Sequence, residues 1–145
     1  MAAQRTAEAT WENDLITGKG RVRFASGALP ETAVTWASRT EAPGGKTSPE
    51  ELLAAAHAAC YSMAFSGGLA KNDTPPKRLD VKATATFDKV ASGWKVTTID
   101  LTVKGDVPGI NSAKFVELAE AAKEGCPISQ ALKGNVTIRL SAALT

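Results

Sequence analysis

The chain has 145 residues, of which 43% are hydrophobic and 22% charged, as is usual for one globular domain with a real core. Its net charge is +2 and its basic residues are scattered, which argues against the concentrated positive surface of a nucleic-acid-binding protein. We find no apolar run close to the ~20 residues of a membrane span. The first residues, MAAQRTAEATWENDL, hold no apolar signal core. We therefore expect a single cytoplasmic domain over residues 1–145, with no membrane or nucleic-acid partner.

The first part of the chain alternates apolar and polar residues. This alternation predicts three strands, around Ala7–Trp11, Val22–Phe24 and Val34–Trp36. Strands of this kind form sheets with one exposed face and mainly antiparallel pairing. The segment RTEAPGGKTS, residues 39–48, then predicts a loop that leads into a helix.

A long helix is predicted from Pro49 to about Leu69. Ser48 is the expected N-cap, with Pro49 at the first helical position and Glu51 completing a capping box. At 100° per residue, Cys60 shares one stripe of the helix with small or apolar residues. These are Leu53, Ala56, Met63, Ala64 and Gly67. We expect this stripe to face an apolar neighbour and to bury Cys60.

The rest of the chain predicts strands, then helices, then a last strand. The expected elements are strands around 81–87 and 94–103, helices over 112–123 (ending at Gly125) and within CPISQAL (126–132), and a strand around 136–140. The apolar phase changes between Val96 and Ile99, which predicts a bulge near Thr97 and Thr98. Runs of strands separated by helices are typical of an α+β fold.

The two cysteines, Cys60 and Cys126, are 66 positions apart and too few for a disulfide scaffold, so redox chemistry and inert packing are both open. Burial alone would raise the pKa of Cys60 and make it unreactive unless a cation lies nearby. Cys126 directly precedes Pro127 at the start of a predicted helix, where the helix dipole favours a thiolate. On these local grounds Cys126 is the more acidic thiol. Their spacing does not say whether they meet.

Two further side chains of the long helix can be related to Cys60. His57 lies one turn earlier, so it is either a catalytic partner or a packing and hydrogen-bonding residue; one histidine and one cysteine are too few for a metal site. Glu50 suits the positive end of the helix dipole. It lies ~15 Å from Cys60 along the helix, and reaches a thiol only if two copies of the helix pack antiparallel about a two-fold axis. The small residues Ala54, Ala55, Ala56, Ala58 and Ala59 would allow that approach.

Two blocks of sequence carry a family resemblance. GGKTSPEELLAAAHAACYSMA and AKEGCPISQALKGNVTI resemble the two signature blocks of the OsmC/Ohr family of organic hydroperoxide peroxidases. ATWENDLITGKG and VPGINSAKFVELAEAAKEGCP extend the resemblance, specifically to the OsmC branch, over nearly the whole chain. The resemblance implies an α+β fold with antiparallel sheets of about six strands wrapped around long central helices. It also implies an intertwined homodimer with active sites at the interface.

The resemblance implies a role for four residues. Cys60 matches the peroxidatic cysteine and Cys126 the resolving cysteine, which together form an intramolecular disulfide. Arg39 matches the arginine that stabilises the thiolate, and Glu50 the glutamate that orients this arginine. This reverses the order of reactivity expected from the helix ends.

The Ohr branch takes its arginine from an earlier loop, so Arg21 and Arg23 are also candidates. The implied reaction uses no metal, haem or flavin. It takes alkyl or lipid hydroperoxides better than hydrogen peroxide, and a dithiol regenerates the enzyme. Relatives use lipoylated proteins, so we expect a dihydrolipoyl group as reductant and a role in defence against oxidative or osmotic stress.

Two other functions compete with this interpretation. A Cys–His hydrolase or transferase would use Cys60 and His57, but the sequence holds no signature for the orienting group and oxyanion site that it needs. A non-catalytic protein, either a binder with an apolar cavity or a dimeric structural protein, would carry its thiols incidentally.

Overall fold

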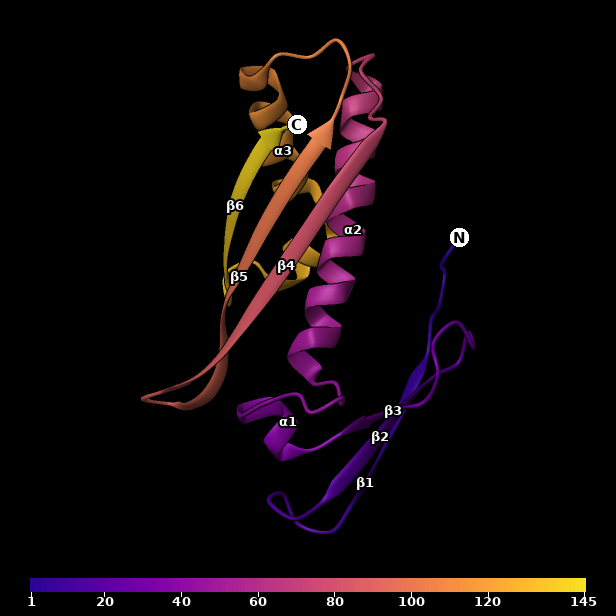
Figure 1. The fold of residues 1–145 in the computed structure, drawn as a ribbon, viewed down its shortest axis with the longest axis vertical. Helices are drawn as coiled ribbons and strands as arrows, with labels where there is room; N and C mark the ends of the chain where they lie inside the picture. The colour runs from indigo at the N-terminus through magenta and orange to yellow at the C-terminus, as the bar shows by residue number, and fades with distance from the viewer. The chain divides into compact units, whose positions relative to one another are not determined.

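The computed structural model describes residues 1–145 and contains six strands and four helices (Figure 1). The elements in chain order are β1 (Ala7–Glu12), β2 (Lys19–Phe24), β3 (Thr32–Val34), α1 (Trp36–Thr40), α2 (Pro49–Lys71), β4 (Arg78–Val90), β5 (Gly93–Asp106), α3 (Ser112–Gly125), α4 (Pro127–Leu132) and β6 (Thr137–Leu144). They form two compact units, Met1–Leu52 and Leu53–Thr145. The α+β class and the number of strands are as predicted.

The first unit holds the antiparallel sheet β1-β2-β3 that the alternation predicts. Its third strand ends at Val34, so the predictions of a strand reaching Trp36 and of a loop beginning at Arg39 are wrong: both residues lie in α1. The cause is a capping box, in which the Thr35 hydroxyl accepts from the Ser38 N–H and the Ser38 hydroxyl accepts from the Thr35 N–H. These two bonds start a helix directly after the strand.

This first unit has no hydrophobic core of its own. No large apolar side chain in it is buried, and Trp11, Leu15, Ile16 and Leu29 are 42–69% exposed. Its buried side chains are polar: Ser38, Thr47 and Glu50. A three-stranded sheet requires a covered apolar face for independent stability. These exposed apolar side chains therefore have to be covered by another surface if the sheet is to be stable.

The second unit contains the sheet β4-β5-β6. Strands β4 and β5 are antiparallel, with Thr86 opposite Thr98 and Phe87 opposite Val96, so Thr97 is an extra residue and the predicted bulge is confirmed. Strand β6 is the exception to the expected antiparallel pairing, because it runs parallel to β5. The reason is the connection through α3 and α4, which returns the chain to the start of β5 before β6 begins.

Helix α2 begins as predicted and ends at Lys71, two residues later than expected. The Ser48 hydroxyl accepts from the Glu51 N–H, which confirms the cap, but the Glu51 carboxylate accepts from the Thr47 hydroxyl at 2.6 Å. By length and composition α2 is long and apolar enough to cross a membrane, contrary to the sequence expectation. One such helix is weak evidence for a membrane span, and one line of its side chains packs in the core of the second unit.

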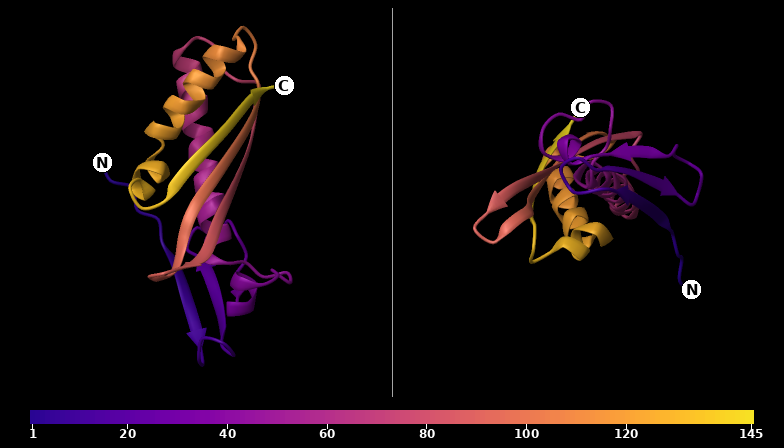
Figure 2. Two further views of the ribbon diagram at one scale, coloured as in Figure 1. Left: turned by 90° about the vertical axis from the view of Figure 1, so that its left-hand side faces the viewer. Right: turned by 90° about the horizontal axis from the view of Figure 1, so that it is seen from below.

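The core of the second unit lies where α2 and α3 cover one face of the sheet (Figures 1 and 2). The buried line of α2 is His57, Tyr61, Phe65 and Leu69, spaced one every four residues. It packs with buried side chains of β5 and α3: Ile99, Leu101, Val103, Phe115 and Ala119. The stripe predicted through Cys60 is therefore right only in part: Leu53, Cys60 and Ala64 pack against this core, whereas Met63 is 69% exposed. Alanines on several faces of α2 left the buried side ambiguous.

Candidate active site

The two cysteines meet in the second unit. Cys60 projects from α2, and Cys126 is both the C-cap of α3 and the N-cap of α4. Their Sγ atoms are 3.3 Å apart and both thiols are free, with the Cys126 thiol donating to the Cys60 sulfur. The Cys126 N–H donates to the Ala122 carbonyl at 2.9 Å, which fixes its backbone at the end of α3. The sulfur atoms need to approach to ~2.0 Å for a disulfide.

The two thiols differ in access to solvent. Cys60 is half-buried, whereas Cys126 is 0% exposed. The prediction that Cys60 is the buried thiol is therefore wrong, because Cys60 lies at the edge of the buried face of α2 and not at its centre. Ala56 and Met63, one turn away in each direction along α2, are exposed. A solute thus reaches Cys60 first, over a surface of small and apolar side chains.

The electrostatics of Cys60 disfavour its thiolate within this unit. Burial raises the pKa of the Cys60 thiol above its ordinary value of 9.0, and the backbone N–H of Ile128, which donates to the sulfur, opposes that effect. A thiol of this kind is mostly protonated at neutral pH. Fast attack on an electrophile requires an added positive charge beside the sulfur.

His57 has a different partner from the one that a Cys–His mechanism requires. Its side chain is fully buried, and Nε2 lies 2.7 Å from the Ser129 hydroxyl of α4, while Nδ1 has no hydrogen-bond partner. Burial lowers the pKa of His57, so the ring is neutral at neutral pH. The geometry favours the hydrogen-bonding role of His57 over the catalytic pair. Ser129 was missed from the sequence, because nothing in the segment CPISQAL indicates that its hydroxyl would bind His57.

Arg39 and Glu50 form an ion pair in the first unit. Arg39 Nη2 and Nε donate to Glu50 Oε1 at 2.8 and 3.0 Å, and Nε also lies 3.2 Å from Oε2. Glu50 is only 7% exposed, and the Arg39 guanidinium lies 5.9 Å from the centre of the Trp36 ring. A guanidinium held in this way has a fixed direction, which suits it to stabilise an anion at one place.

The loop between α1 and α2 brings these two residues together. The Ser38 hydroxyl donates to the Thr47 carbonyl at 2.9 Å, and the Thr47 N–H donates to the Ala33 carbonyl at 3.0 Å. Thr47 is thereby attached to β3 and α1 immediately before α2 begins. The first turn of α2, with Glu50, is held next to the helix that carries Arg39.

The two alternative arginines are placed differently. Arg21 lies 3.7 Å from Glu31, and Arg23 is paired with Glu8. All four of these side chains are more than half exposed to solvent. Exposed pairs contribute little and reorient readily. Among the three candidates, Arg39 is the arginine held by a buried carboxylate.

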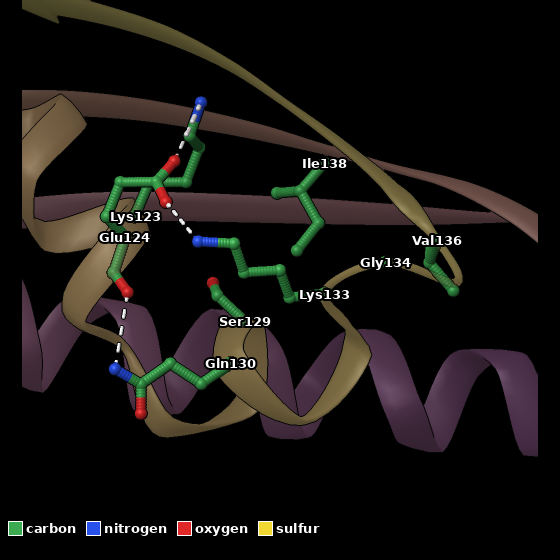
Figure 3. Close-up of a pocket in the computed structure, with 8 residues that line it drawn as sticks. All are labelled: Lys123, Glu124, Ser129, Gln130, Lys133, Gly134, Val136 and Ile138. Carbon is green, nitrogen blue, oxygen red and sulfur yellow. Dashed lines mark hydrogen bonds and ion pairs between the residues drawn. The ribbon is translucent and has the colours of Figure 1, made fainter.

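A cavity of about 140 Å³ lies beside α4 (Figure 3). Its lining residues are Lys123, Glu124, Ser129, Gln130, Lys133, Gly134, Val136 and Ile138. Neither cysteine lines it, and the Glu124 carboxylate is within 4 Å of the ammonium groups of Lys123 and Lys133. This charged cavity does not suit the apolar-cavity binder considered from the sequence. Histidine, cysteine and acidic side chains do not gather in groups of three that would hold a metal ion.

The fold and the thiol pair define a class of protein: an α+β protein with one accessible and one buried cysteine in contact. The OsmC-like protein family matches residues 42–141, and the chain belongs to this family. It is 41% identical over 138 residues to Peroxiredoxin OsmC of Escherichia coli, covering 95% of this chain and 96% of that relative. It is 28% identical over 126 residues to the organic hydroperoxide resistance protein of Xanthomonas axonopodis pv. citri, covering 86% and 87% of the two chains.

Solved structures of similar proteins share the fold. The organic hydroperoxide resistance protein OhrB of Bacillus subtilis superposes with a TM-score of 0.76 at 27% identity, over 94% of this chain and 97% of that chain. An organic hydroperoxide resistance protein OsmC from Legionella pneumophila gives a TM-score of 0.77 at 25% identity, over 98% and 99% of the chains. The resemblance expected from the two cysteine blocks is confirmed.

Proposed function

We propose that this protein is a thiol-dependent peroxidase that reduces organic hydroperoxides, with Cys60 as the peroxidatic and Cys126 as the resolving cysteine. The observation that carries the proposal is the 3.3 Å contact between a half-buried and a fully buried thiol. A hydroperoxide reaches Cys60 but not Cys126. The names of the relatives, peroxiredoxin and organic hydroperoxide resistance protein, support the same activity.

The first step is attack by the Cys60 thiolate on one oxygen of the hydroperoxide. An S–O bond forms and the O–O bond breaks, so the substrate leaves as an alcohol after taking a proton, and Cys60 becomes a sulfenic acid. Since burial disfavours the Cys60 thiolate, we assign the compensating positive charge to Arg39, oriented by Glu50. A guanidinium stabilises both the thiolate and the alkoxide that develops in the transition state.

The second step is attack by Cys126 on the Cys60 sulfenic acid. An S–S bond forms, the S–O bond breaks, and the departing hydroxide leaves as water with a proton from the Cys126 thiol. The sulfur of Cys126 already lies in contact with that of Cys60, so closure requires a shift of little more than 1 Å. The buried position of Cys126 protects its thiol from direct oxidation by peroxide until Cys60 has become a sulfenic acid.

An external dithiol then reduces the disulfide. We propose a dihydrolipoyl group, as implied by the family resemblance, because a flexible dithiol arm can exchange with Cys60 from the solvent side. The exposed Ala56 and Met63 beside Cys60 favour alkyl or lipid hydroperoxides over hydrogen peroxide. Comparing dihydrolipoamide with thioredoxin in steady-state turnover tests the reductant. Equal or faster turnover with thioredoxin would contradict the proposed one.

We also propose that the active form is a homodimer. The first unit exposes Trp11, Leu15, Ile16 and Leu29 and buries no large apolar side chain, while α2 of the second unit exposes Met63. A second copy would cover such surfaces, as in most two-fold oligomers. Sedimentation at micromolar concentration is expected to give twice the 15.1 kDa mass of one chain. A monomer that is fully active would contradict this part of the proposal.

Peroxidase kinetics of two cysteine variants test the proposed function. Cys60→Ser is expected to abolish consumption of an alkyl hydroperoxide, and Cys126→Ser to consume one equivalent and then stop with a stable sulfenic acid. The wild type is expected to have a higher kcat/KM for the alkyl hydroperoxide than for hydrogen peroxide. Turnover by Cys60→Ser at the wild-type rate would show that the nucleophile is not Cys60.

A further inference from the structure

A second contact accompanies the thiol pair between α2 and α4. His57 lies one turn before Cys60 on α2, and Ser129 lies one turn after Cys126 on α4. The 2.7 Å bond from His57 Nε2 to the Ser129 hydroxyl therefore runs beside the 3.3 Å contact between the sulfur atoms. Two contacts one helical turn apart fix both the distance and the rotation of one helix relative to the other.

The His57–Ser129 bond is buried, whereas the other polar side-chain contacts of this segment are not. His57 is 0% and Ser129 4% exposed. Gln130 and Lys133 reach the carbonyl and carboxylate of Glu124 at 3.5 and 3.4 Å, as long bonds at an exposed surface. The buried bond is the stronger constraint on α4, because water does not compete for its partners.

The other ring nitrogen of His57 makes no such contact. This nitrogen, Nδ1, is buried without a partner, which costs free energy that an apolar side chain in the same place would avoid. Burial keeps the ring neutral, so His57 adds no positive charge for the Cys60 thiolate. The effect of His57 on this site is therefore geometric: its Nε2 holds Ser129 in place through the hydrogen bond.

The effect passes from Ser129 to the reacting sulfur atoms through a short piece of backbone. Ile128, the residue before Ser129, donates its backbone N–H to the Cys60 sulfur, and Cys126 caps the same helix without a side-chain bond of its own. α4 has only six residues. A rotation of so short a helix would move the Ile128 N–H and the Cys126 sulfur together.

We infer that His57 and Ser129 are positioning residues for disulfide formation: their hydrogen bond holds α4 so that the Cys126 sulfur faces the Cys60 sulfur. This inference rests on the proposed peroxidase function for its biological meaning. The geometric claim, however, applies to any electrophilic sulfur at Cys60. It can therefore be tested with and without a hydroperoxide.

The test uses Ser129→Ala, which removes the hydroxyl, and Ser129→Thr, which keeps it. Threonine keeps the hydroxyl and adds only one methyl group, at a residue that lines the cavity beside α4 (Figure 3). Ser62→Ala is the matched control, since the Ser62 hydroxyl donates to Ala59 O within α2 and does not contact α4. His57→Phe removes the same bond from the other side.

The peroxide-independent measurement uses an aromatic disulfide that releases a coloured thiolate. The first release reports attack by Cys60, and the second, unimolecular release reports closure by Cys126. Ser129→Ala and His57→Phe are each expected to slow the second release about tenfold, corresponding to ~1.4 kcal/mol, with a smaller effect on the first. The double variant is expected to be no slower than either single one, and Ser129→Thr and Ser62→Ala to behave as wild type.

The peroxide-dependent measurement follows the Cys60 sulfenic acid with a trapping reagent after one equivalent of alkyl hydroperoxide. Ser129→Ala is expected to prolong the sulfenic acid about tenfold. Wild-type closure rates in Ser129→Ala, or equal slowing of both releases, would overturn the inference. Failure of the wild type to react with hydroperoxide while the aromatic disulfide still shows the predicted order would instead overturn the peroxidase function alone.

Discussion

Replacing Arg39 by glutamine is predicted to raise the pH that Cys60 needs for attack on a hydroperoxide. Even at its ordinary pKa of 9.0, only about 1% of a thiol is thiolate at pH 7, and burial lowers that fraction further for Cys60. If Arg39 supplies the compensating charge, each pKa unit that it contributes is worth ~1.4 kcal/mol, or tenfold in thiolate. Arg39→Gln should therefore slow attack at pH 7 at least about tenfold, with the difference narrowing towards pH 9.

The same substitution also affects stability, and the two effects can be separated. Glu50, 7% exposed, loses the three hydrogen bonds that it accepts from Arg39. Breaking one side of a buried pair costs about 3–5 kcal/mol, and the partly exposed Arg39 places this site near the lower end. The double variant Arg39→Gln/Glu50→Gln replaces the pair by two neutral amides. It should recover part of the stability and none of the reactivity.

The assay is the second-order rate of Cys60 sulfenic acid formation from pH 5 to pH 10, measured with urea unfolding of the same variants. Arg23→Gln is the matched control, because Arg23 is an exposed arginine paired with Glu8. It should leave the pH profile unchanged. An unshifted profile in Arg39→Gln, or a shift in Arg23→Gln instead, would refute the assignment of Arg39.

Two further predictions concern the fold. Gly105→Ala should destabilise the protein by about 1–3 kcal/mol, because the added Cβ would lie 2.6 Å from a ring carbon of Phe115. Thermal unfolding measures this loss of stability. The control is Gly67→Ala, whose added Cβ meets nothing within 4 Å and which should not be destabilised. His57 is the only histidine and burial lowers its pKa, so its contribution to stability is complete above pH 6.5 and is lost as the pH falls through the lowered folded pKa. Urea unfolding should therefore show a loss of up to about 1.4 kcal/mol between pH 7.5 and 5.5, absent in His57→Gln; an equal loss in that variant would contradict the assignment.

The parts of the fold that sequence could predict are those set by local patterns. Alternation of apolar residues located the strands, and the change of phase after Val96 located the bulge at Thr97. Ser48 fixed the start of α2. The short helix α1 was missed although Thr35 and Ser38 form a capping box, because its five residues were too few for helical periodicity and followed a strand directly.

The remaining features depend on which elements pack together. The parallel pairing of β6 follows from the path of α3 and α4 and leaves no mark on the alternation of β6 itself. The centre of the buried side of α2 was misplaced because alanine fits every face of a helix, whereas the buried line passes through His57. Ser129 became visible only with the two helices side by side. Its contact with His57 joins residues 72 positions apart.

The proposed function requires that Cys60 and Cys126 of one chain form a disulfide when a hydroperoxide is reduced. The most direct measurement adds one equivalent of an alkyl hydroperoxide to the reduced protein, followed by thiol counting and non-reducing peptide mapping by mass spectrometry. The expected result is loss of both thiols, a Cys60–Cys126 crosslink within one chain, and one equivalent of alcohol. Two free thiols after complete consumption of the peroxide, or a crosslink only between chains, would contradict it.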